Sequence, residues 1–191
     1  MPLAEPGSSR KLLHTRTVRC YGYEREDGLW DIEGQMTDLK SYAIPNQDRG
    51  GLIVAGEPLH GMWVRLTVDT ELLIHAVEAV TDWAPFKLCP EIVGRYQLLI
   101  GQHIKPGWNL KIKQLFKGVQ GCTHLTELLG PLATTAYQTI HPRRRGEKRP
   151  PPGDQEQPRI INSCHALRSD GEVVRAHWPR FYTGAEPVTA E

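Results

Sequence analysis

The feature that most constrains the fold is a pair of alternating segments joined by Asp27-Gly28. Residues 17–25 and 29–36 alternate between apolar or aromatic side chains and polar ones, with the two-residue period of a β-strand. Asp-Gly between two such runs is typical of a tight antiparallel hairpin. The sequence therefore predicts that the fold begins with two antiparallel strands.

Further strands follow the first hairpin. Residues 62–69 and 72–81 predict a second pair, after a connection at 41–58 whose prolines and glycines indicate a loop. The two predicted pairs together give four antiparallel strands. A hairpin is also predicted near the C-terminus, where Asp170-Gly171 separates two further β-like runs.

Beyond residue 90 the apolar residues recur at helical spacing. This spacing predicts helices over residues 92–100, 110–116 and 123–140, the last kinked or interrupted at Gly130-Pro131. Together the patterns predict an α+β fold. We expect an antiparallel sheet of about four to six strands, packed on one side by three or four helices.

The 191 residues correspond in length to about one domain. We expect residues 1–14 to be a flexible N-terminal segment, 15–182 a single α+β domain and 183–191 a C-terminal tail. Residues 141–158 are charged and rich in proline, which predicts a mobile insertion.

Charge and hydropathy argue against two classes of partner. Lys and Arg number 23 against 22 Asp and Glu, so the net charge of +1 offers no field to attract nucleic acid. No segment approaches the roughly 18 consecutive apolar residues needed to span a bilayer, and no signal peptide precedes the fold. We expect a cytoplasmic protein with neither nucleic-acid nor membrane partners.

The four cysteines lie far apart in the sequence: Cys20, Cys89, Cys122 and Cys164. Without a C-x-x-C pair or a signal peptide, we interpret them as thiols. A metal site built from the last three with His124 or His165 stays open as an alternative, although it lacks short ligand spacings.

The densest set of reactive side chains surrounds the predicted start of the third helix. Thr123 can cap this helix, and the positive end of the helix dipole faces Cys122 and His124. His124 and Glu127 lie three residues apart on one helical face, where the carboxylate could orient the imidazole for acid/base catalysis. Alternatively, Glu127 interacts only with the helix dipole and His124 with a loop.

Two further sets of candidates lie on the predicted strands. His60 stands at the entrance of a strand, where residues often line clefts, although a lone loop histidine is more often a surface residue. Tyr21, Tyr23 and Arg25 share one face of the first strand by parity. They could hold an anionic or phenolic ligand, although the solvated face of a sheet has the same pattern.

Several ordered motifs can be taken together: Tyr23-x-Arg25-x-Asp27-Gly28, Gly56-Glu57-Pro58-Leu59-His60, Ala84-Pro85-Phe86-x-x-Cys89-Pro90, Gly121-Cys122-Thr123-His124 and Ser163-Cys164-His165-Ala166. In these motifs the chain resembles the bacterial domain-of-unknown-function 2889 family over about residues 15–180. The resemblance brings no established activity. It implies an association with aromatic and acyl-compound catabolism, and with lyases that release formaldehyde from lignin-derived phenolic dimers.

These observations lead to one functional hypothesis and two alternatives. We expect an enzyme that acts on a phenolic or aromatic small molecule, as a carbon-carbon lyase that releases formaldehyde. We expect it to use no metal or other cofactor and to form a homodimer. A non-catalytic small-molecule-binding or assembly module and a Cys/His metal-binding protein are the alternatives. The candidate catalytic residues are His124, Glu127, His60 and Tyr23, and the candidate substrate-binding residues are Arg25, Tyr21, Arg65, Trp63 and Cys122. The hypothesis requires His60 and His124 to meet in space.

Overall fold

The computed structural model describes residues 3–146, 157–158 and 160–185. The chain divides into two compact units, Met1–Arg144 and Arg145–Glu191. The sequence interpretation, by contrast, placed residues 15–182 in one domain. The first 6 residues of the predicted 141–158 insertion belong to a helix. Most of the rest of that insertion, and the end of the predicted C-terminal tail, lie outside the described residues.

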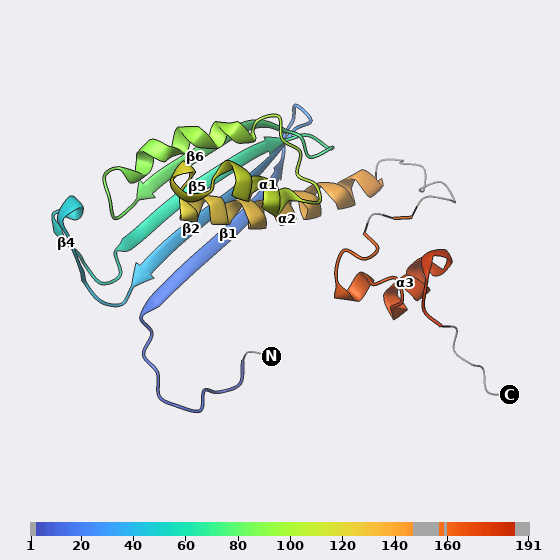
Figure 1. Ribbon diagram of the computed structural model, residues 1–191, viewed down its shortest axis with the longest axis horizontal. Helices are drawn as coiled ribbons and strands as arrows, with labels where there is room; N and C mark the ends of the chain where they lie inside the picture. The colour runs from blue at the N-terminus through green and yellow to red at the C-terminus, as the bar shows by residue number, and fades with distance from the viewer. Residues whose placement is uncertain (1–2, 147–156, 159, 186–191) are drawn as a thin grey trace. The chain divides into compact units, whose positions relative to one another are not determined.

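The first unit is built on a four-stranded antiparallel sheet (Figure 1). Its strands are β1 (His14–Glu24), β2 (Trp30–Lys40), β5 (Pro58–Val68) and β6 (Ile74–Trp83), which lie side by side in the order β1-β2-β5-β6. Gly28 closes the first hairpin with a φ of 81°, a left-handed conformation that favours glycine. Both predicted pairs of strands are confirmed, and the first strand begins at His14, one residue inside the predicted flexible segment.

The connection at 41–58 is more ordered than the predicted loop. It contains β3 (Ile44–Asn46) and β4 (Gly51–Ile53), which pair with each other, and a 3₁₀ turn η1 (Gln47–Arg49) between them. The Asn46 side chain accepts a hydrogen bond from the backbone N–H of Arg49, and Gly50 ends the turn in the left-handed region. Strands of three residues are too short to produce a readable alternation, so the sequence pattern showed only the turn residues.

Helices follow the strands and cover one face of the sheet (Figure 1). They are the 3₁₀ helix η2 (Cys89–Leu99), α1 (Trp108–Leu115), a 3₁₀ turn η3 (Gly118–Gln120) and α2 (Thr123–Gly146). The predicted α+β fold is confirmed. Helix α2 runs through Gly130-Pro131 without the predicted interruption. Residues on both sides of this pair are fully buried against the sheet, and this packing stabilises the helix across the proline.

The core lies between the sheet and α2. Along β2 and β5 alternate side chains are buried on the helix-covered face, and the apolar stripe of α2 packs on them: Ile32, Met36, Met62, Val64, Leu66, Leu125, Leu128, Leu129 and Leu132. Two glycines let the helix approach. A Cβ on Gly34 would lie 3.1 Å from Leu132, and one on Gly22 would lie 2.1 Å from the Thr139 hydroxyl oxygen. Helix α2 therefore lies directly over β1 and β2.

The second unit contains no strand among its described residues. It holds two 3₁₀ turns, η4 (His165–Leu167) and η5 (Pro179–Phe181), and the short helix α3 (Glu172–His177). The hairpin predicted around Asp170-Gly171 is therefore wrong. Gly171 instead precedes α3, and the Asn162 side chain accepts from the backbone N–H of Ser169 to close the turn before it.

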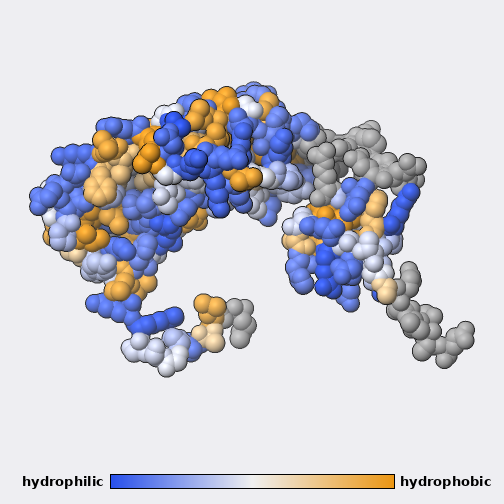
Figure 2. Space-filling model, viewed as in Figure 1, coloured by the Kyte–Doolittle hydropathy of each residue, from blue (hydrophilic) through white to orange (hydrophobic). Residues whose placement is uncertain are grey.

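The face of the molecule seen in Figure 2 is mainly hydrophilic, with apolar residues in smaller groups among the hydrophilic ones. Within the described ranges, none of the helices combines the length and the apolar character that crossing a membrane requires.

Candidate functional site

Three polar residues form a row across three neighbouring strands at one end of the sheet. Arg16 of β1 lies opposite Asp38 of β2, and Asp38 lies opposite His60 of β5. Asp38 has the same parity as the buried Ile32 and Met36, so the row lies on the face that the helices cover. The first turn of α2 adds His124 to this row.

Asp38 is the centre of the group, because its carboxylate is almost completely buried and accepts four hydrogen bonds. Its Oδ1 accepts from His14 Nε2 and from Arg16 Nε, each at 2.8 Å. Its Oδ2 accepts from Arg16 Nη2 at 2.8 Å and from His60 Nδ1 at 2.9 Å. Since a carboxylate has about four lone-pair positions, the acceptor capacity of Asp38 is filled.

The hydrogen bonds keep Asp38 ionised. Burial alone would raise the pKa of this carboxyl, but the bonds from Arg16, His14 and His60, with the charge of Arg16, outweigh burial and hold the pKa well below its usual range. An ionised carboxylate can only accept. His60 therefore carries its proton on Nδ1, which leaves the lone pair of Nε2 to take a proton from another molecule.

His124 stacks on His60. The two ring centroids are 3.7 Å apart with an angle of 30° between the planes, and Nε2 of His124 lies 3.8 Å from Oδ2 of Asp38. Burial lowers the pKa of both imidazoles. The neighbouring His124 lowers that of His60 further, and Arg16 lowers that of His124, against the opposing effect of Asp38 on each. The lowered pKa values favour the neutral form of both rings, whose side chains are 12% and 23% exposed.

Glu127 has a different partner from the one that the sequence predicted. Its Oε2 accepts from Arg16 Nη1 at 2.5 Å, and the side chain is about half exposed. The carboxylate next to the His124 ring is that of Asp38. The three-residue spacing of His124 and Glu127 places them on one face of α2. Glu127 nevertheless binds Arg16, because the long arginine side chain extends to it from β1.

Cys122 lies immediately before α2 and completes the group. Its Sγ is 4.0 Å from Nδ1 of His124. The buried Tyr96 fixes the backbone here: its hydroxyl donates to the carbonyl of Cys122 at 2.9 Å and accepts from the N–H of Cys122 at 3.1 Å. Tyr96 therefore holds the start of α2, and with it His124, at a defined position over the sheet.

The remaining candidates lie on the opposite face of the sheet. Five of the sequence-predicted site residues share this uncovered face, as the strand register and their ion pairs show: Tyr21, Tyr23, Arg25, Trp63 and Arg65. On this face Arg65 pairs with Glu33 and Glu78, and Arg25 pairs with Asp27 and Asp31. The structure thus brings His60, His124, Glu127 and Cys122 together and separates them from the tyrosines and arginines by the thickness of the sheet.

Three residues of the group were missed by the sequence analysis: His14, Arg16 and Asp38. The predicted strands were too short at this end of the sheet: the first was predicted to begin at residue 17 and the second to end at residue 36, whereas β1 begins at His14 and β2 ends at Lys40. A signal was present. Continuing the alternation of Ile32 and Met36 by two residues places Asp38 on the buried face, and a buried aspartate needs partners.

The same residues could hold a metal ion. Within the part of the chain that the structure describes, one ligand atom from each of Asp38, His60 and His124 lies within 4.8 Å of the others. Two imidazoles and a carboxylate are a ligand set that proteins use for iron and zinc. Here both carboxylate oxygens also contact Arg16, whose positive charge opposes a cation at the same place. We therefore interpret the group as a hydrogen-bonded cluster. The alternative metal site, built from Cys89, Cys122 and Cys164 with His124 or His165, stays a prediction.

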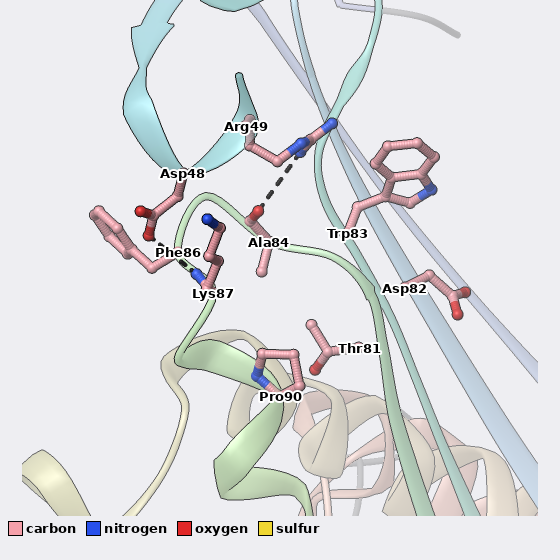
Figure 3. A pocket seen from close by; sticks show the side chains of 9 residues that line it. All are labelled: Asp48, Arg49, Thr81, Asp82, Trp83, Ala84, Phe86, Lys87 and Pro90. Carbon is pink, nitrogen blue, oxygen red and sulfur yellow. Dashed lines mark hydrogen bonds between the residues drawn. The ribbon is translucent and has the colours of Figure 1, made fainter. Parts of the chain in front are cut away.

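A pocket of about 240 Å³ lies elsewhere in the first unit, between the end of β6 and the β3–β4 connection (Figure 3). Arg49 lies over the Trp83 ring at 4.7 Å and donates to the carbonyl of Ala84, while Asp48 accepts from the backbone N–H of Lys87. None of the sequence-predicted site residues lines this pocket. The polar contacts of this pocket join the β3–β4 connection to the segment that follows β6. We interpret these contacts as structural.

Comparison with known proteins identifies one family. The model of a family described as "Protein of unknown function (DUF2889)" matches residues 14–138. This range contains all seven residues of the group described above, which we call the histidine cluster: His14, Arg16, Asp38, His60, Cys122, His124 and Glu127. No curated protein and no solved structure matches the chain.

Proposed function

The chain belongs to the DUF2889 family, and from the geometry of its own residues we propose that it is an enzyme that catalyses proton transfer on a small molecule. His60, oriented by Asp38, is the general base, and His124 is the second acid/base group. The observation that carries this proposal is the convergence of two imidazoles, from β5 and from α2, on one buried carboxylate.

Each member of the cluster has a defined task in this proposal. Asp38 holds His60 with Nδ1 protonated, so that Nε2 faces away from the carboxylate as the basic atom. When His60 takes a proton, the imidazolium is stabilised by the negative charge of Asp38, while Arg16 keeps that charge in place. The lowered pKa of both imidazoles keeps them in the neutral, basic form at neutral pH.

The narrower proposal concerns the reaction. The resemblance to the family implies a lyase that releases formaldehyde from a phenolic dimer, and this chemistry needs only a base and an acid. His60 takes the proton of a hydroxymethyl group and becomes an imidazolium, the carbon-carbon bond breaks, and formaldehyde leaves. The same proton then returns, directly or through His124, to the carbon atom that kept the electron pair. His60 and His124 supply these two groups without a cofactor.

The aromatic substrate would have to bind on the helix-covered side. Tyr21, Tyr23 and Arg25 were predicted to hold an anionic or phenolic ligand, but they face away from the histidines. We assign the chemistry to His60, His124, Asp38 and Arg16 and give the tyrosines no part in it. The homodimer and the cytoplasmic location expected from the sequence belong to the same proposal, and light scattering after size-exclusion chromatography tests the former.

The test is an activity screen with matched histidine variants. Purified protein is incubated with phenolic dimers that carry a hydroxymethyl group, and released formaldehyde is measured. His60→Gln should lower the rate about 100-fold or more, since a positioned base contributes at least that much. His75→Gln is the control, because His75 also pairs with an aspartate, Asp69, but on the exposed surface.

Two results would contradict the proposal. Full activity in folded His60→Gln protein would remove this histidine from catalysis. Binding of the dimers, seen as a raised melting temperature, without product from any of them would favour the non-catalytic binding module.

A further inference from the structure

We propose that Cys122 is a nucleophilic thiol that adds to the carbonyl carbon of a small aldehyde, with His124 as its base and Asp38 behind the imidazole. The inference deepens the proposed function, since it uses the same histidine cluster. It adds a covalent step and a ligand class that proton transfer alone does not require.

The geometry is that of a thiol, an imidazole and a carboxylate in series. Nδ1 of His124 faces Sγ of Cys122 at 4.0 Å, and Nε2 of the same ring faces Oδ2 of Asp38 at 3.8 Å. No hydrogen bond joins His124 to Asp38 at this distance, but the negative charge of Asp38 favours the tautomer with the proton on the nearer Nε2. The lone pair of Nδ1 is then directed toward the thiol, which is the arrangement that an activated cysteine needs.

Cys122 lies at the N-terminal end of α2. The residue directly precedes Thr123, the first residue of α2, and its carbonyl accepts from the N–H of Thr126, so it begins the helical hydrogen-bond pattern. The N-terminus of a long helix carries partial positive charge, which stabilises an anion there. Cys122 is partly exposed, at a place where its side chain packs against the edge of the core.

The other cysteines provide an internal comparison. Cys20 lies on the helix-covered face of β1, where burial raises the pKa of its thiol. Cys89 is partly exposed at the start of η2, and Cys164 is exposed in the second unit. If exposure alone decided reactivity, Cys164 would react fastest. The cluster predicts Cys122 instead.

The proposed step balances without an oxidant or reductant. The thiol proton moves to Nδ1 of His124, and the sulfur electron pair forms a bond to the aldehyde carbon. The π pair of the C=O bond moves to oxygen, which takes the proton back from His124. The product is a hemithioacetal, and the reverse sequence releases the aldehyde. An enzyme that liberates formaldehyde would hold its product at such a thiol before release.

The test uses alkylation of the full-length protein by iodoacetamide, followed by peptide mass spectrometry of all four cysteines. Rates are divided by those of the urea-unfolded chain, which corrects for local sequence. We expect Cys122 to react about tenfold faster than Cys164 at pH 7.

Variants and a protecting aldehyde separate the parts of the proposal. His124→Gln should slow the labelling of Cys122 toward that of Cys89, whereas His75→Gln should leave it unchanged. Propionaldehyde should slow the labelling of Cys122 alone, and dialysis should reverse this protection. Since the comparison of the four cysteines and the protection by propionaldehyde need no variant, the proposal can be tested even if His124→Gln does not fold.

Three outcomes would overturn the inference. Fastest labelling at Cys164 would show that exposure alone governs reactivity. An unchanged rate in folded His124→Gln would remove the histidine as base, and a reactive Cys122 that propionaldehyde does not protect would exclude the aldehyde. Labelling requires no turnover, so its failure would leave the proton-transfer proposal standing, and a failed formaldehyde assay would leave the reactivity of the thiol standing.

Discussion

The replacement of Asp38 by Asn has the largest effect that the cluster predicts. The amide keeps the size of the side chain but removes its charge and half of its acceptor capacity. Arg16, His14 and His60 then face a partner that can no longer accept from all of them. Removing one partner of a buried ion pair costs about 3–5 kcal/mol of unfolding free energy. We expect about 3 kcal/mol, because Arg16 is a third exposed and water replaces part of the loss.

The assay is urea unfolding at pH 7, followed by circular dichroism. With an m-value of about 2 kcal/mol/M, a loss of about 3 kcal/mol lowers the midpoint by about 1.5 M. Asp69→Asn is the matched control: Asp69 also accepts from a histidine, at 2.8 Å, but the pair is exposed, so the loss should stay below about 1 kcal/mol. Equal midpoint shifts in the two variants would refute the view that Asp38 is a buried, ionised centre.

Three further predictions follow from the same structure. Because folding lowers the pKa of His60 and His124, the unfolding free energy should be highest above the ordinary histidine value of 6.5 and fall with pH below it, by at most about 1.4 kcal/mol per pH unit for each ring; urea midpoints from pH 8 to 5 test this, and the double glutamine variant should give a flatter profile. Gly22→Ala should cost about 1–3 kcal/mol in the same assay, since its Cβ would lie 2.1 Å from a side-chain oxygen of α2, whereas Gly94→Ala, with nothing within 4 Å, should cost less than about 0.5 kcal/mol. Glu127→Gln should lower formaldehyde release far less than His60→Gln does, because Glu127 binds Arg16 rather than His124; a loss of rate as large as that of His60→Gln would restore the role that the sequence predicted.

The sequence predicted the main sheet because its information is local. Asp27-Gly28 and the alternation on both sides of it determine a hairpin without reference to the rest of the chain. The C-terminal region shows the limit of this approach. Around Gly171 a turn signal lies between short β-like runs, and the six-residue helix α3 is too short to show a helical period of its own.

The candidate site could be predicted only in part, because it depends on which face of the sheet is covered. Parity placed Tyr21 and Tyr23 together on one face of β1, and the structure confirms that. The face that α2 covers follows from contacts far apart in sequence, such as that between Gly22 and Thr139. His60 and His124 were found because imidazoles at the ends of elements are conspicuous. Asp38 was missed because an aspartate is rarely buried.

The protonation state of His60 tests the central claim most directly. Nitrogen NMR of the imidazole side chains distinguishes the two neutral tautomers from the charged ring. At pH 7 we predict a neutral His60 ring with its proton on Nδ1, and in Asp38→Asn protein the loss of this preference. A charged ring at pH 7, or a neutral ring with its proton on Nε2, would contradict the assignment of His60 as a base oriented by Asp38.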